Sequence, residues 1–276
     1  MKKKIGYLGP EGTYTDQASY LYSQTDIRIP YGTIKDVTKS IENGDIDECI
    51  LPIENSLHGT VIEVIDYLIA SKKNQIKNEL MLEINHCLIG KNIKDLSKIK
   101  VVKSKFEAFQ QCKKFIDDFL PNANLIPTAS TATAVNELIS DDNDTVAIGP
   151  ERAAELAKIP IIKRSIQDNN NNITRFIVIS KNDHIPTNDD KTSIAFEFDK
   201  DSPGLIYSSL KPFSDKNINL TKIESRPTGK RLGSYIFLID FEGHKEEKKI
   251  SETLSFIKKN TINFKILGSY PKAKII

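Results

Sequence analysis

The tract NNNNITRF, residues 169–176, places a hydroxyl and a guanidinium where an asparagine-rich loop runs into an apolar segment. Thr174 could donate a hydrogen bond to a departing oxygen, and Arg175 could bind an anion through two parallel hydrogen bonds. The alternative is a polar loop that ends at a strand whose first residues happen to be polar. The choice between these two interpretations depends on the other residues that could bind a substrate or take part in catalysis.

Small and polar residues also occupy four junctions between an expected strand and an expected helix. The junctions are GPEGTYT at 9–15, PIENSLHGT at 52–60, PTASTATA at 127–134 and IGPERAA at 148–154. The first turn of a helix has unpaired backbone N–H groups and the positive end of the helix dipole, which together favour an anion. Each junction taken alone is equally well an ordinary helix cap. The four together predict a cleft for a small anion.

Several kinds of site are excluded by the motifs that the chain lacks. It has no GxxxxGK[ST] loop, and Gly6, Gly9 and Gly12 do not form GxGxxG, so carboxylate is a better candidate than phosphate. No GxSxG segment provides a hydrolase nucleophile. The four histidines lack the spacing of metal ligands, and we expect neither a metal nor a cofactor. They are His58, His86, His184 and His244, of which His86, in EINHCLIG, is interpreted as a core histidine. The candidate groups that remain are hydroxyls, amides and one guanidinium, and these can assist an elimination reaction.

Composition narrows the class of protein further. The 276 residues carry 39 basic and 37 acidic side chains, and a net charge of +2 gives no field that would attract nucleic acid. No run approaches the roughly 18 apolar residues of a membrane span, so no membrane partner is expected. Three separated cysteines without a CxxC pair predict a reduced, cytoplasmic setting; they are Cys49, Cys87 and Cys112.

Strand-like and helix-like segments alternate through the first 180 residues. We expect strands at 4–9, 27–32, 48–53, 80–89, 100–104, 124–129, 145–149, 159–166 and 175–180. We expect helices at 14–23, 34–43, 60–71, 105–120, 131–140 and 150–158. This alternation predicts an α/β fold with parallel crossovers.

A polar, proline-containing segment at 182–191 breaks this alternation and is interpreted as a linker. After it, strands are expected at 192–199, 219–227, 233–243 and 264–270, with helices at 204–216 and 248–260. The order strand, helix, strand, strand, helix, strand is that of a ferredoxin-like domain. The chain is therefore predicted to form two domains, 1–181 and 192–276.

Five motifs, in order, resemble prephenate dehydratase followed by an ACT regulatory domain. LGPEGTYT is similar to the family's opening glycine-rich turn, and LPIENSLHGTV to its PIENSxxGxV segment. STATA resembles STAxA, IQDNNNNITRF resembles IxDxxxNxTRF, and INLTKIESRP resembles the ESRP motif of the ACT domain. The resemblance covers nearly the whole chain.

The resemblance implies conversion of prephenate to phenylpyruvate with loss of CO2 and water, a step of phenylalanine biosynthesis. It implies a two-lobed α/β catalytic domain like the second type of periplasmic binding protein, with the site between the lobes. One lobe would comprise about 1–75 plus 162–181, and the other 76–161. No long helical region precedes the first motif, so a fused chorismate mutase is not expected.

Matching the motifs residue by residue implies the roles of individual side chains. Thr174 matches the threonine thought to assist departure of the ring hydroxyl, and Arg175 is the candidate for holding a carboxylate. The remaining catalytic candidates are Asn55, Ser104 and Gln111. The substrate-binding candidates are Thr13, Thr15, Ser56, Ser130, Thr131, Asn172 and Phe176. The segment VVKSKFEAFQQC departs from the family, because Lys105, Phe106 and Glu107 stand where His, Pro and Gln are common.

In the ACT domain, the resemblance implies an L-phenylalanine effector site at a subunit interface of a homodimer or homotetramer, paired through ACT and catalytic domains. Its residues would be Gly204, Leu205, Ile206, Glu224, Ser225, Arg226 and Pro227. Leu205 replaces a small alanine, and it either crowds the effector or packs into the interface. Two other functions stay open: arogenate dehydratase, and a non-catalytic protein that senses or binds an amino acid.

Overall fold

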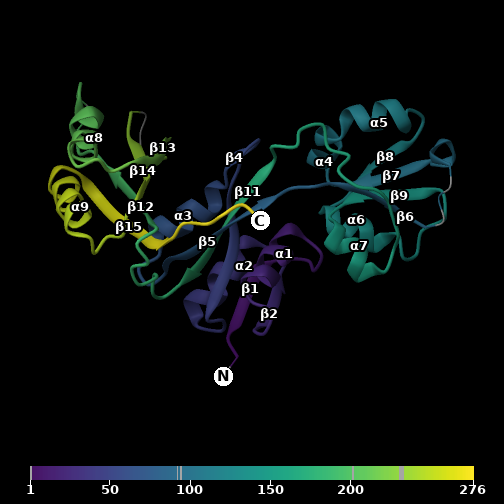
Figure 1. The fold of residues 1–276 in the computed structure, drawn as a ribbon, viewed down its shortest axis with the longest axis horizontal. Coiled ribbons are helices and arrows are strands. Elements are labelled where there is room, and N and C mark those ends of the chain that lie inside the picture. The colour runs from purple at the N-terminus through teal and green to yellow at the C-terminus, as the bar shows by residue number, and fades with distance from the viewer. Residues whose placement is uncertain (1, 92, 94, 201, 230–232) are drawn as a thin grey trace. The chain divides into compact units, whose positions relative to one another are not determined.

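Residues 2–91, 93, 95–200, 202–229 and 233–276 are described by the computed structural model (Figure 1). The chain divides into two compact units. Unit 1 comprises Met1–Val61, Leu80–Phe176 and Ile275–Ile276, and unit 2 comprises Ile62–Glu79 and Ile177–Lys274. Three sheets, each with its own helices, account for most of the described residues.

The first sheet has the strand order β2-β1-β3-β11-β5, with the short β4 paired to β3. Its strands are β1 (Lys4–Leu8), β2 (Ile27–Tyr31), β3 (Glu48–Asn55), β4 (Gly59–Thr60), β5 (Gln75–Glu83) and β11 (Ile173–Ser180). Helix α1 (Tyr14–Tyr22) connects β1 to β2, and α2 (Ile34–Asn43) connects β2 to β3. Because β1 is parallel to both β2 and β3, the predicted parallel crossovers are confirmed.

The second sheet lies wholly in unit 1 and has the order β10-β6-β9-β7-β8. Its strands are β6 (Cys87–Gly90), β7 (Val101–Ser104), β8 (Asn124–Pro127), β9 (Thr145–Gly149) and β10 (Ile161–Lys163). Helices α4 (Phe106–Gln111) and α5 (Lys113–Phe119) cover one face, and α6 (Thr131–Glu137) and α7 (Glu151–Ala157) cover the other (Figure 1). Along β9, Val146 and Ile148 pack towards the first pair while Ala147 packs towards the second, as the two-residue period of a strand requires.

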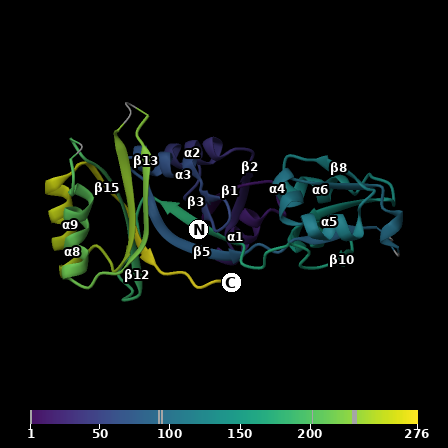
Figure 2. The ribbon, with the colours of Figure 1, turned by 90° about the horizontal axis from the view of Figure 1, so that it is seen from above.

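The third sheet, in unit 2, has the antiparallel order β13-β14-β12-β15. Its elements are β12 (Asp190–Glu197), α8 (Leu205–Asp215), β13 (Leu220–Pro227), β14 (Tyr235–Glu242), α9 (Lys248–Asn260) and β15 (Ile262–Pro271). Both helices lie on one face, where Phe213 and Leu254 pack with Phe196 and Ile239 (Figure 2). The predicted ferredoxin-like order is confirmed.

The segment expected as one strand at 80–89 is two strands, and the residues between them explain the break. Strand β5 ends at Glu83 and β6 begins at Cys87. Between them, the Ile84 N–H donates to the Asn172 carbonyl at 2.8 Å, and the His86 N–H donates to the Gln167 side-chain oxygen at 3.0 Å. Residues 84–86 thus bond to residues 167–172 and leave the strand ladder.

The helix expected at 105–120 is also two helices, α4 and α5, which meet at Cys112. The Gln111 carbonyl accepts the Asp168 N–H at 2.7 Å, and the Asp168 carboxylate accepts the Lys114 N–H at 3.2 Å. These two groups are a carbonyl and an N–H that a continuous helix would have paired within itself. A residue of the asparagine-rich loop therefore interrupts the helix, which periodicity within 105–120 cannot reveal.

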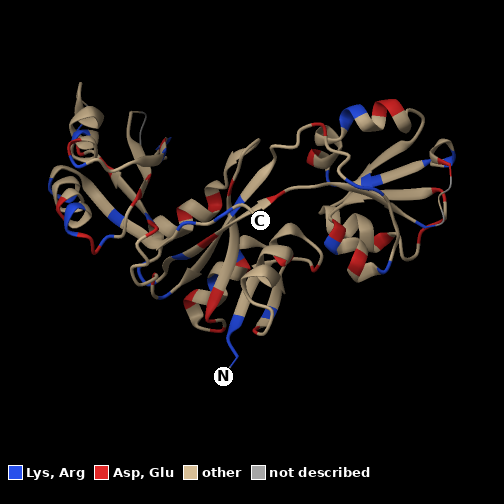
Figure 3. Ribbon diagram, viewed as in Figure 1, with Lys and Arg blue, Asp and Glu red and all other residues tan. Residues whose placement is uncertain are grey.

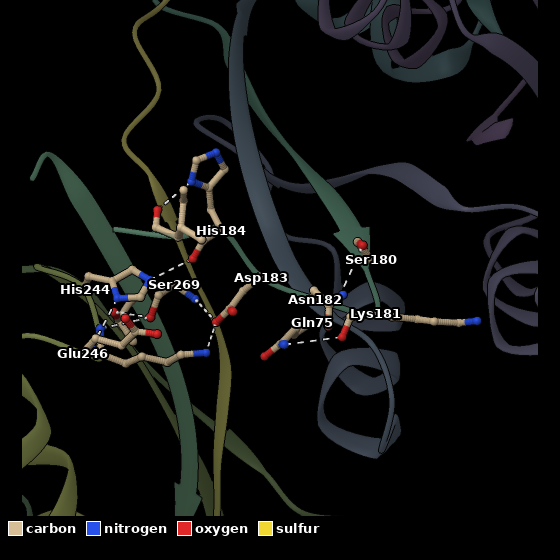
Figure 4. Close-up of polar contacts among 12 residues, drawn as sticks. Gln75, Ser180, Lys181, Asn182, Asp183, His184, His244, Glu246 and Ser269 are labelled. Atoms are coloured by element: carbon tan, nitrogen blue, oxygen red, sulfur yellow. Dashed lines mark hydrogen bonds and ion pairs between the residues drawn. The ribbon is translucent and has the colours of Figure 1, made fainter. Parts of the chain in front are cut away.

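The segment interpreted as a linker lies within unit 2 and makes polar contacts there (Figure 4). Strand β12 begins at Asp190, two residues before the predicted strand. The Glu246 N–H donates to His244 Nδ1 at 3.2 Å, so Nε2 carries the ring hydrogen of neutral His244 and donates to the His184 carbonyl at 2.9 Å. The Asp183 carboxylate accepts the Ser269 N–H at 3.2 Å and pairs with Lys245.

Charged side chains of both signs are interspersed along the described elements (Figure 3). Within the described residues, no helix is long and apolar enough to cross a membrane. Over the same residues, no group of three or more His, Cys, Asp or Glu side chains is arranged to hold a metal ion. Cys49, Cys87 and Cys112 are buried free thiols.

Candidate active site

A cavity of about 460 Å³ in unit 1 brings together most of the predicted site segments. Its size lies in the usual range of pockets that bind small organic molecules. It is lined by the turn before α1, the end of β3 with the loop after it, residues 84–86, the start of α4, and the start of β11. The predicted residues that line it are Thr13, Thr15, Asn55, Gln111, Thr131, Asn172, Thr174 and Phe176.

Strand alternation decides which residues of the TRF motif face this cavity. Asn172, Thr174 and Phe176 line it, two residues apart on one face of β11. Arg175 is buried and is absent from the lining; its guanidinium lies 3.5 Å from the Glu54 carboxylate. The structure therefore places the hydroxyl of the motif in the cavity and the guanidinium behind it.

Asn55 fixes the direction of the hydrogen bond to Thr174. Its Oδ1 accepts the backbone N–H groups of Leu57 and His58 at 3.0 and 3.1 Å, so the other side-chain atom must be the amide nitrogen. That Nδ2 donates to Thr174 Oγ1 at 2.9 Å and to Asn172 Oδ1 at 2.8 Å. Thr174 Oγ1 is therefore an acceptor towards Asn55. Its hydroxyl hydrogen has no acceptor among the described residues and remains for a bound molecule.

The direction of the hydrogen bond between Asn172 and Gln111 follows from the one between Asn55 and Asn172. Because Asn172 Oδ1 accepts from Asn55, its Nδ2 is the donor, and it lies 3.2 Å from Gln111 Oε1. Gln111 Oε1 also faces His86 Nε2 at 2.6 Å, so that nitrogen carries a hydrogen. Gln111 Nε2 then donates to His58 Nε2 at 2.8 Å, which makes this His58 nitrogen an acceptor. Two backbone N–H groups thus set the direction of every hydrogen bond in this network.

His86 is buried and ends the network together with Tyr14, whose hydroxyl oxygen lies 3.3 Å from His86 Nδ1. Burial lowers the pKa of His86, with the Gln111 hydrogen bond opposing the shift, so the imidazole is neutral at neutral pH. Burial raises the pKa of the Tyr14 phenol well above its usual value, and its hydroxyl donates to the Asn85 carbonyl at 2.8 Å. The interpretation of His86 as a buried, hydrogen-bonded histidine is correct, but it also lines the cavity.

Charged side chains in the lining are of both signs. Glu54, Lys105 and Glu107 line the cavity, and Lys105 Nζ lies 3.2 Å from the Glu107 carboxylate. Burial acts to raise the pKa of Glu107, but hydrogen bonds from its own N–H and from Lys105, together with the charge of Lys105, lower it on balance. Lys105 is the one Lys or Arg among the described lining residues.

Besides Arg175, three predicted site residues lie outside the lining and have local partners. Ser104 is fully buried and donates to the Ile148 carbonyl at 2.6 Å. Ser130 caps α6 by accepting the Thr133 N–H at 3.0 Å. Ser56 accepts the Ile173 N–H and donates to the Asn171 carbonyl, both at 2.9 Å, which ties the loop after β3 to the start of β11.

Several lining residues were absent from the predicted site. Tyr14 stands between the two threonines of the first junction, and His58 stands in the second junction, so the junction argument could have named both. In the sequence, Lys105 and Glu107 stand out only as departures from the family pattern. No signal in the sequence connects His86 to Gln111, because the break between β5 and β6 brings them together.

The predicted effector residues lie in unit 2 and occupy two places. Gly204, Leu205 and Ile206 line a cavity of about 140 Å³ together with Phe198 and Phe237. Glu224–Pro227 lie on β13, at the edge of the third sheet, and outside this cavity. The Arg226 guanidinium pairs with Asp66 of α3 (Ile62–Ala70), also in unit 2.

The comparisons with known proteins agree with each other. A family model described as prephenate dehydratase matches residues 5–184. A prephenate dehydratase of Methanocaldococcus jannaschii is 40% identical over 98% of this chain and 99% of its own length. A bifunctional chorismate mutase/prephenate dehydratase of Aquifex aeolicus is 38% identical over 99% of this chain and 74% of its own length. The solved structure of a prephenate dehydratase of Arthrobacter aurescens, in complex with L-Phe, aligns with a TM-score of 0.87 and 31% identity, covering 98% of this chain and 90% of that one. The chain belongs to the prephenate dehydratase family.

Proposed function

We propose that this protein converts prephenate to phenylpyruvate, as a carbon–oxygen lyase of phenylalanine biosynthesis. In this reaction the bond from the ring to one carboxylate breaks and releases CO2, and its electron pair enters the ring. The ring C–O bond breaks at the opposite position, and the departing hydroxide takes a proton from solvent to become water. Because the product ring is aromatic, the reaction runs downhill and needs positioning more than a strong acid.

The observation that carries this proposal is the direction of the hydrogen bond between Asn55 and Thr174. Asn55 occupies a lone pair of the threonine oxygen, so the hydroxyl hydrogen is left to donate to the departing oxygen of prephenate. A threonine hydroxyl is too weak an acid to release its proton outright. A fixed donor at the site where negative charge develops contributes about 10²- to 10³-fold to the rate.

The two carboxylates of prephenate need positive charge or hydrogen-bond donors. We propose that Lys105 binds one of them, because it lines the cavity and carries the required charge. Arg175 takes a different part: its pairing with Glu54 compensates a negative charge that would otherwise face the dianion. Thr15 and Thr131, in the first turns of α1 and α6, supply hydroxyls at the cavity wall, whereas the Thr13 hydroxyl caps α1 and donates to the Pro10 carbonyl.

The direct test is steady-state turnover of prephenate by purified protein, followed as phenylpyruvate formation, with arogenate as a parallel substrate. Thr174→Val removes the hydroxyl at nearly constant volume, and Thr174→Ser keeps it. We expect Thr174→Val to lower kcat by about 10²- to 10³-fold and Thr174→Ser to retain most of it. Equal kcat for Thr174→Val and the wild type would remove Thr174 from the mechanism, and absence of turnover by the wild type would refute the proposed function.

We also propose that L-phenylalanine regulates the enzyme. The Arthrobacter aurescens prephenate dehydratase structure is in complex with L-Phe, and in this chain Gly204–Ile206 line a cavity in the third-sheet domain. Because Glu224–Pro227 lie on an edge strand and not in that cavity, we propose that the two segments meet across the interface of a homodimer or homotetramer. Calorimetry with millimolar L-phenylalanine tests this, and an absence of binding heat with unchanged kcat and KM would refute it.

For the domains, we propose a catalytic part at 1–181, a linker at 182–191 and a regulatory ACT domain at 192–276. The end of the matching family model at residue 184 supports the first boundary. A cytoplasmic location is proposed on the three free, buried thiols.

A further inference from the structure

Gln111 is held by three side chains, and each contact has a required polarity. Its Oε1 accepts from Asn172 Nδ2 at 3.2 Å and faces His86 Nε2 at 2.6 Å, while its Nε2 lies 2.8 Å from His58 Nε2. The Asn172 contact cannot reverse, because Asn172 Oδ1 is already an acceptor from Asn55, which two backbone N–H groups hold in place. His58 therefore has to offer an unprotonated Nε2.

We propose that neutral His58 is a positioning residue for the dehydration, acting on Thr174 through Gln111, Asn172 and Asn55, and that its protonation switches this support off. The inference rests on the proposed function, because it concerns the donor to the leaving oxygen. His58 lines the cavity, but its side chain bonds to Gln111 and not to Thr174. It supplies the last acceptor in a chain of amides whose other end positions the threonine hydroxyl.

A protonated His58 leaves the network with no good alternative. An imidazolium has hydrogens on both nitrogens, so Gln111 Nε2 would face another donor. Turning the Gln111 amide over would place its N–H groups against Asn172 Nδ2 and against the hydrogen on His86 Nε2. His58 is exposed, on the loop between β3 and β4, so the imidazolium is free to turn into solvent. Gln111 would then lose one of three restraints, and with it Asn172 and Thr174 would be less well positioned.

The charged and titratable groups around His58 act in both directions. Glu54 from β3 and Glu107 from α4 line the same cavity and favour the imidazolium, whereas Lys105, just before α4, opposes it. His86 is neutral and contributes a hydrogen-bond donor to Gln111. Histidine is the side chain whose charge ordinarily changes between about pH 5 and pH 8, which is why the test varies pH over this range.

The test compares kcat against pH for the wild type, His58→Gln and His58→Ala, with His184→Gln of unit 2 as the matched control. The amide introduced by His58→Gln would offer an oxygen acceptor that does not titrate near neutrality. We expect the wild-type kcat to fall about fivefold or more from about pH 8 to pH 5, the equivalent of one hydrogen bond. His58→Gln should retain most of the kcat and lose most of this fall, and His58→Ala should show the reduced kcat at every pH. His184→Gln should reproduce the wild-type profile.

Two results would overturn the inference. One is a decrease in kcat of His58→Gln towards acid pH as large as that of the wild type. The other is a kcat of His58→Ala equal to the wild-type value at every pH. A change confined to KM would also contradict a role in positioning Thr174. Nitrogen-15 NMR of labelled histidine gives an independent readout, since neutral His58 should carry its hydrogen on Nδ1. A wild type without any turnover of prephenate refutes the proposed function itself, whereas an active wild type with a His58-independent profile refutes only this inference.

Discussion

Replacing Asn55 by aspartate reverses one hydrogen bond and leaves the shape of the side chain almost unchanged. One carboxylate oxygen can still accept the N–H groups of Leu57 and His58, so the loop after β3 is kept. The other oxygen replaces the nitrogen that donates to Thr174 and Asn172 at 2.9 and 2.8 Å. The Thr174 hydroxyl will then donate to this carboxylate and no longer to the leaving oxygen.

The expected decrease in kcat follows from the loss of one hydrogen-bond donor to the leaving oxygen. Removing one donor to a developing oxyanion costs about 2.7 to 4 kcal/mol, so kcat of Asn55→Asp should fall about 10²- to 10³-fold. KM should rise as well, because a new negative charge faces a substrate with two carboxylates. The free energy of unfolding should fall by only about 1 to 3 kcal/mol, the cost of an unfavourable polar contact at Asn172.

Steady-state kinetics with prephenate measure kcat and KM, and urea unfolding measures the free energy of unfolding. Asn171→Asp is the matched control, because it introduces the same charge in the neighbouring loop at an exposed side chain. That control should keep kcat within about twofold and stability within about 0.5 kcal/mol. A kcat of Asn55→Asp within about threefold of the wild type would refute the reasoning from hydrogen-bond polarity, whatever the stability of the variant.

Three further predictions concern charge, burial and backbone. Lys105→Met should raise KM for prephenate about two- to fivefold with little change in kcat, because the half-exposed ammonium contributes about 1 kcal/mol at most; Lys105→Arg should restore KM. Lys191→Met should lower the free energy of unfolding by about 3 to 5 kcal/mol, since it leaves the Glu79 carboxylate buried without the ammonium now 3.1 Å away; Glu79→Gln in the same chain should recover part of the loss in urea unfolding. Gly268→Ala should lower the thermal midpoint, at a cost of about 3 kcal/mol, because a Cβ there would lie 2.1 Å from the Ile76 carbonyl oxygen at a φ of +154°; an unchanged midpoint would contradict the close approach.

The order of helices and strands could be predicted because each element is indicated by a pattern in its own neighbouring residues. The strand at 145–149 and the helix at 248–260 match the structure to the residue, since their apolar period and flanking residues are local signals. The two segments that were divided wrongly, 80–89 and 105–120, are both interrupted by hydrogen bonds from residues 167–172. A break caused by a loop more than 50 residues away has no counterpart in local periodicity.

In the candidate site, too, features that depend on neighbouring residues could be predicted, and features that depend on contacts between distant residues could not. Motifs identified Thr174, Asn55 and Asn172, and spacing along β11 alone implies that Thr174 and Arg175 point to opposite faces. The two-residue period of a strand, applied to the TRF motif, is therefore enough to separate the hydroxyl from the guanidinium. The direction of the hydrogen bonds required more, because it depends on two backbone N–H groups that hold Asn55 and on contacts that run from residue 55 to 172, 111 and 58. A motif can name the residue that donates to the leaving oxygen. Only the assembled network explains why its hydrogen is available to do so.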